Sequence, residues 1–119
     1  MNSITAQEWE LLSFFEAEPE FLDPEVPWAY NDALYRVRVK QNIVSFAVQP
    51  AYRDVRLILS IDDLNVYELS AMGVADVRYR KESGIETIEI LLHERNSVVL
   101  SLKPHVRIRQ EWGGELNLG

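Results

Sequence analysis

Residues 35–48, YRVRVKQNIVSFAV, decide the fold, because apolar and polar side chains alternate along both halves of this stretch. A period of two is typical of a β-strand that buries one face. Between the halves, Gln41-Asn42 is suited to a two-residue turn. The stretch therefore predicts an antiparallel hairpin, with the pairs Val39–Val44, Val37–Phe46 and Tyr35–Val48.

The same alternation continues through the rest of the chain, which predicts antiparallel strands over residues 33–111. A Ser83-Gly84 turn and a three-residue loop over 94–96 both keep the apolar side chains on one face, and a slip of one residue would reverse that face. We therefore expect a meander, in which each strand lies beside its sequence neighbours. The expected pairs are Tyr79–Ile88 and Val77–Ile90 across the turn, and Leu92–Val98 and Ile90–Leu100 across the loop.

The N-terminal third has a different pattern. Thr5 and Glu8 have the spacing of a capping box, and apolar residues follow at helical intervals, so we expect a helix over about residues 5–17. Three prolines lie in the next segment, which predicts an extended connector over residues 18–31. At the other end, Gly113-Gly114 begins a segment that we expect to be a loose tail, 113–119.

The predicted helix is too small to cover the predicted sheet. Eight strands at about 4.8 Å spacing form a sheet roughly 38 Å wide, whereas a helix of about eleven residues covers roughly 16 by 10 Å. Large exposed apolar faces are rare in monomers. We therefore predict an α+β fold, in which the helix packs on a strongly curved, mainly antiparallel meander of about seven or eight strands, a partial barrel. A homodimer is the other way to cover the apolar face.

Length, charge and composition narrow the class of protein. The 119 residues fit a single domain, 1–119. The formal net charge is −7, from 12 Lys and Arg against 19 Asp and Glu, which disfavours nucleic-acid phosphates as a partner. The absence of cysteine excludes disulfides and thiolate zinc sites. With no secretory signal and no apolar run long enough for a bilayer, we expect a cytoplasmic protein without membrane contact.

Three predicted strands repeat an alternating arginine pattern, and guanidinium groups suit bidentate contacts with carboxylates. The simpler interpretation is a solvated outer face with cross-strand ion pairs, such as Arg78–Glu89, each contributing well under about 1 kcal/mol. The candidate interaction face consists of Arg36, Arg38, Arg78, Arg80, Arg107 and Arg109.

The sequence predicts no catalytic, cofactor-binding or metal-binding residue. His93-Glu94 lacks the second histidine of a zinc-protease motif, because Ser97 occupies that position. Asp62-Asp63 does not begin a calcium loop, since Glu68 and Val74 replace the required glycine and glutamate. We therefore expect no cofactor.

Two classes of function stay open. The favoured interpretation is a small non-enzymatic protein-interaction or accessory domain that binds an acidic or basic protein surface, and an immunity or antitoxin role is one version of it. The alternative is a carrier of small ligands, or a minor enzyme, with a pocket inside the curled sheet. No motif in the sequence identifies a family.

Overall fold

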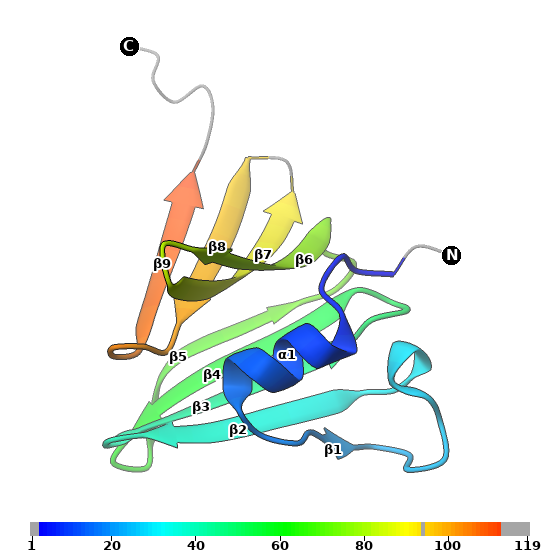
Figure 1. The fold of residues 1–119 in the computed structure, drawn as a ribbon, viewed down its shortest axis with the longest axis horizontal. Coiled ribbons are helices and arrows are strands. Elements are labelled where there is room, and N and C mark those ends of the chain that lie inside the picture. The colour runs from blue at the N-terminus through cyan, green and yellow to red at the C-terminus, as the bar shows by residue number, and fades with distance from the viewer. Residues whose placement is uncertain (1–2, 94, 113–119) are drawn as a thin grey trace.

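The computed structural model describes residues 3–93 and 95–112, which form one α-helix and two antiparallel sheets with nine strands (Figure 1). The predicted tail, 113–119, lies outside the described residues. The helix is α1 (Glu8–Phe15), and a short 3-10 helix, η1, spans Trp28–Tyr30. Sheet A contains β1 (Glu20–Phe21), β2 (Ala33–Val39), β3 (Asn42–Gln49), β4 (Asp54–Ile61) and β5 (Leu64–Ala71). Sheet B contains β6 (Asp76–Glu82), β7 (Ile85–His93), β8 (Asn96–Ser101) and β9 (Arg107–Trp112).

The meander is confirmed within each sheet, but the single curved sheet and the partial barrel are not what the structure has. The chain leaves sheet A after β5 and begins sheet B at β6. Gly73 has a φ of +62°, which a residue without a Cβ adopts readily, and the next residue, Val74, is buried. The N–H of Val74 donates to the Arg53 carbonyl at 2.8 Å, and the N–H of Ala75 donates to the Leu91 carbonyl at 2.7 Å. These bonds fix the crossing between the sheets.

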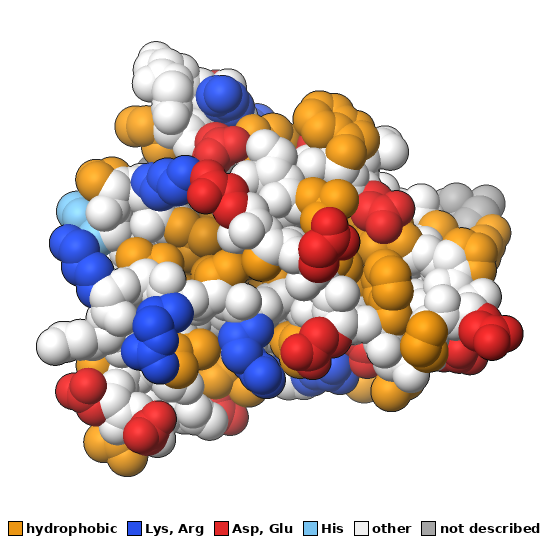
Figure 2. Space-filling view, turned by 60° about the horizontal axis from the view of Figure 1, so that its bottom comes forward, with side chains coloured by type: hydrophobic (Ala, Val, Ile, Leu, Met, Phe, Trp, Pro, Cys, Tyr) orange, Lys and Arg blue, Asp and Glu red, His pale blue; other side chains and the backbone are white. Residues whose placement is uncertain are grey.

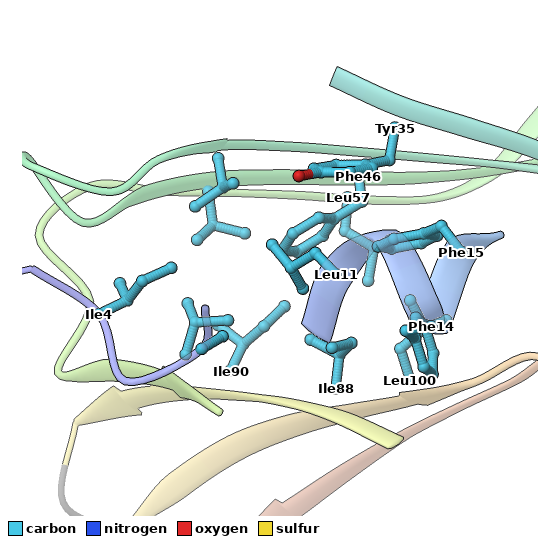
Figure 3. Close-up of a cluster of buried hydrophobic side chains, with 14 of the residues drawn as sticks. Ile4, Leu11, Phe14, Phe15, Tyr35, Phe46, Leu57, Ile88, Ile90 and Leu100 are labelled. Atoms are coloured by element: carbon cyan, nitrogen blue, oxygen red, sulfur yellow. The ribbon is translucent and has the colours of Figure 1, made fainter. Parts of the chain in front are cut away.

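A second sheet, rather than curling, covers the apolar face that the helix leaves open. Figure 3 shows α1 between the two sheets, with its buried side chains toward both of them. The Phe15 ring lies 5.0 Å from the Tyr35 ring and 5.5 Å from the Phe46 ring, between centroids. One cluster of buried side chains thus joins the helix and both sheets; it includes Leu11, Phe14, Phe15, Tyr35, Phe46, Leu57, Ile88, Ile90 and Leu100.

One of the three predicted turn registers is confirmed. Ser83 and Gly84 both have positive φ values, 53° and 79°, as a tight hairpin turn requires. The turn pairs Tyr79 with Ile88 and Arg78 with Glu89.

The other two registers are wrong by two residues. The first hairpin turns at Lys40-Gln41, with Lys40 at a φ of +59°, so that Val37 lies opposite Val44. Across β7 and β8, Ile90 lies opposite Val98, and the register shifts between Leu91 and His93. A shift of two preserves which side chains face the core, because the period of a strand is two. The hydrophobic pattern alone could not distinguish these registers.

The helix begins at Glu8, three residues after the predicted Thr5 cap. The backbone N–H of Gln7 donates to Glu10 Oε1 at 2.8 Å. Thr5 serves another purpose, because its N–H donates to Asp76 Oδ1 at 2.8 Å. The N–H of Ala6 donates to the Val77 carbonyl at 2.8 Å, so the segment before the helix is fixed to β6.

Candidate functional site

The six candidate arginines do not share one surface. Arg36 and Arg38 are exposed on β2 in sheet A, where they alternate with inward-facing residues such as the buried Tyr35. The other four lie on the edge strands of sheet B, Arg78 and Arg80 on β6 and Arg107 and Arg109 on β9. The structure therefore divides the predicted face into two separate surfaces.

Three of these arginines, Arg80, Arg107 and Arg109, surround a hollow of about 400 Å³ on the outer face of sheet B, which we call the trough. Its floor lies on the two central strands, where the outward side chains Thr87, Val99 and Ser101 are short. Its walls lie on β6 and β9, three strand spacings apart, or about 14 Å. The full lining is Arg80, Glu82, Ile85, Thr87, Glu89, Val99, Ser101, Arg107, Arg109 and Glu111.

The ion pairs of sheet B differ from the predicted pair. The backbone register places Arg78 opposite Glu89, but Arg78 Nε lies 3.5 Å from Asp76 Oδ2 on its own strand. Glu89 instead pairs diagonally with Arg80, at 3.7 Å from Nε to Oε1. The predicted Arg78–Glu89 ion pair is therefore wrong, because each long arginine side chain reaches a neighbouring row.

Two groups in the trough keep unused binding capacity. Glu89 Oε1 is buried and has no hydrogen-bond donor among the described residues. Arg109 Nε donates to Glu111 Oε2 at 2.8 Å, whereas Arg107 has no ion pair within the described part of the chain. Arg107 and Glu89 are thus two groups of opposite charge in the trough whose hydrogen-bonding capacity the described residues do not use.

A smaller hollow, about 290 Å³, lies at the β1 side of sheet A and is lined by residues that include Phe21, Leu34 and Arg56. Arg56 is already paired, because its Nη2 lies 3.1 Å from Asp32 Oδ2. Figure 2 turns the β1–β2 side toward the viewer and shows Lys and Arg side chains beside Asp and Glu, with apolar side chains between them. On this side of the described residues, basic and acidic side chains are therefore mixed.

Sequence reasoning missed the carboxylates of the trough, Glu82, Glu89 and Glu111, as members of a site. Their position on the polar phase of their strands was readable from the alternation. Their grouping with the arginines depends on the order β6-β7-β8-β9, and it requires the correct register between β7 and β8.

The described residues hold no group of three or more His, Asp or Glu side chains placed to bind a metal ion. His93 and His105 are both exposed. Within the same part of the chain, no helix is long and apolar enough to span a bilayer.

No family model and no curated protein matches this chain. A solved structure does, a chain of the contact-dependent growth inhibition toxin–immunity protein complex from Klebsiella pneumoniae 342. The TM-score is 0.76 at 20% sequence identity, and the match covers 92% of this chain and 96% of that chain. The two chains therefore share a fold along nearly their whole lengths.

Proposed function

We propose that this chain is a non-enzymatic protein-binding domain with the role of an immunity protein, and that its partner is a toxin protein. The observation that carries the proposal is the likeness of fold to a chain from a toxin–immunity protein complex, which extends over 92% of this chain and 96% of that one. Because both chains are covered almost completely, the likeness involves the whole architecture rather than one common hairpin.

Two properties of the chain favour the immunity role over the toxin role. The space between the sheets is occupied by the shared apolar cluster, and both hollows described above lie on outer faces. A surface of this kind is suited to contact with another protein rather than to enclosing a substrate. The net charge of −7 would attract a basic partner at long range and raise the association rate. As part of this proposal, the protein acts in the cytoplasm.

Co-expression with the product of the adjacent gene tests the proposal. We expect that product to arrest growth when expressed alone, and growth to resume when this chain is supplied with it. The two purified proteins should elute together in size-exclusion chromatography. If the adjacent product is harmless, or if it is toxic but neither binds this chain nor is neutralised by it, the immunity role is wrong.

A further inference from the structure

We infer, on the basis of the proposed function, that the trough on sheet B is the partner-binding surface. It accepts a partner element that carries a carboxylate against Arg107 and a Lys or Arg side chain against Glu89. Four observations support this assignment: the shape of the trough, two of its charged groups that lack hydrogen-bond partners among the described residues, their spacing, and the contrast with sheet A.

The shape fits one secondary-structure element. The walls stand on strands about 14 Å apart, and an α-helix with its side chains is about 10 to 12 Å across. The floor has short side chains, and the lining is partly apolar: Val99 is only 8% exposed, whereas Ile85 is 56% exposed. An amphipathic element can therefore lie along the trough and remove Ile85 from water.

The two groups without hydrogen-bond partners, Glu89 Oε1 and the Arg107 guanidinium, determine the chemistry of that element. A buried carboxylate oxygen without a donor is unfavourable, as Glu89 Oε1 is here, so a donor supplied by the partner gains more than an ordinary surface contact. Arg80 is too distant to provide that hydrogen bond, at 3.7 Å from Nε to Oε1. No described residue accepts a hydrogen bond from the Arg107 guanidinium, and this group is suited to bidentate contact with an incoming carboxylate.

The spacing of the two groups adds selectivity. Arg107 lies on β9 and Glu89 on β7, two strands apart and offset by two residues along the strands. Their Cα atoms are therefore about 12 Å apart. A partner element must present its carboxylate and its basic side chain at a matching distance, and like charges in either place would be rejected.

The outer face of sheet A provides a matched control. Arg38, like Arg107, is exposed, has no ion pair among the described residues and belongs to the candidate arginines. Arg38→Glu and Arg107→Glu change the net charge equally, so long-range attraction is the same in both variants. For the carboxylate, Glu68→Gln on sheet A changes the net charge as Glu89→Gln does, at an exposed position where Glu68 accepts a hydrogen bond from Asn65 Nδ2 at 3.1 Å.

The experiment is a calorimetric titration of each variant with the product of the adjacent gene. We expect Arg107→Glu to raise Kd at least tenfold and Glu89→Gln at least fivefold, while Arg38→Glu and Glu68→Gln change it less than twofold. Urea unfolding should show that all four variants are folded.

Each other outcome counts against the inference. If the wild-type chain does not bind, the proposed function fails. If it binds and both trough variants bind equally well, the trough assignment alone is overturned. Salt-sensitive binding of a 20-nucleotide RNA that Arg107→Glu abolishes would assign the trough to nucleic acid. A concentration-dependent dimer that the same variant disrupts would assign it to a second copy of this chain.

Discussion

The outer faces of sheets A and B carry the same alternating arginine pattern, yet they have different shapes. On sheet B, the arginines stand on edge strands, and the short side chains Thr87, Val99 and Ser101 lie between them. On sheet A, Arg36 and Arg38 stand on β2, Ser45 lies opposite Arg36 on the central strand β3, and the larger Arg56 and Ile58 stand on the next strand, β4. The comparison shows that a trough depends on how side-chain length is distributed across strands. The pattern along any single strand does not determine it.

The largest expected effect is on the free energy of unfolding, and it tests whether the two sheets share one hydrophobic core although their outer faces differ. Phe46 in sheet A and Leu100 in sheet B are both fully buried in the same cluster. We expect Phe46→Ala to lower the free energy of unfolding by about 3–5 kcal/mol and Leu100→Ala by about 2–5 kcal/mol. Urea denaturation followed by fluorescence and by circular dichroism should give one coincident transition for each variant. Two separate transitions would mean that the sheets unfold independently.

The next effect concerns one tyrosine from each sheet at high pH. Burial raises the pKa of Tyr35 to about 12, although Trp28 Nε1 donates to its hydroxyl at 2.9 Å. Since the unfolded value is about 10, the folded state retains the proton between these values, and stability falls as pH rises from about 10 to about 12. The total loss is roughly 2–3 kcal/mol. Urea midpoints at pH 9, 10 and 11 should fall less steeply for Tyr35→Phe than for the wild type.

Tyr79 in sheet B gives a contrasting case. Its hydroxyl donates to Glu86 Oε2 at 2.6 Å, and this hydrogen bond raises its pKa to about 12. The side chain is only partly buried, so solvent screening should make its pH-dependent contribution smaller than that of Tyr35. For Tyr35, if the urea midpoint fell equally steeply with pH in Tyr35→Phe and in the wild type, the proposed effect of burial on its pKa would be contradicted.

A third prediction compares the carboxylates of Asp76, which holds the N-terminal segment at Thr5, and Asp54, which holds the inter-sheet loop at Gly73. Burial raises the pKa of Asp76, but hydrogen bonds from Thr5, Val77 and Arg78 outweigh it and leave the pKa below its ordinary value. Asp76→Asn should therefore cost about 1–2 kcal/mol at pH 7. Among the described residues, the Asp54 carboxylate in sheet A accepts one hydrogen bond, from the Gly73 N–H at 3.0 Å, and Asp54→Asn should cost less.

The pH dependence of that effect has a definite sign. The stability from Asp76 is present above its unfolded pKa, about 3.9, and is lost as pH falls through the lowered folded pKa. The difference between wild type and Asp76→Asn should shrink over that acidic range in thermal unfolding experiments. A difference that stays constant down to pH 2 would show that the carboxylate charge is not involved.

The smallest effects are expected at the exposed ion pairs of the two outer faces. Arg80, Arg109 and Arg56 are each about half exposed, and exposed ion pairs contribute about 0–1 kcal/mol. Alanine at each position should shift the urea midpoint by an amount equivalent to less than about 0.5 kcal/mol. A larger loss at Arg80 or Arg109 would mean that the trough walls stabilise the fold, and binding data on those variants would need correction for it.

The alternation in the sequence predicted which side chains face inward, and this part of the fold followed directly from the residues. Tyr35, Phe46, Ile88 and Leu100 are all buried as their phase requires. The register of the hairpins was harder to predict, because a shift of two residues leaves the same faces buried. The turn position also depends on Lys40, which has a positive φ although lysine rarely adopts one.

The division into two sheets could not be predicted from the periodicity. A glycine such as Gly73 allows the chain to bend, but whether the chain bends within one sheet or crosses to another depends on the tertiary packing of Val74. The candidate site shows the same limit. The arginines were identifiable, whereas their separation into two surfaces, and the carboxylates beside three of them, required the arrangement of the strands.

Site-specific photocrosslinking tests the central claim most directly. Ser101 on the trough floor and Ser45 on the outer face of sheet A are both partly buried serines on interior strands. With benzoylphenylalanine at either position, we predict that irradiation joins the product of the adjacent gene to position 101 and not to position 45. Crosslinking at position 45 alone, from a complex that forms normally, would contradict the account.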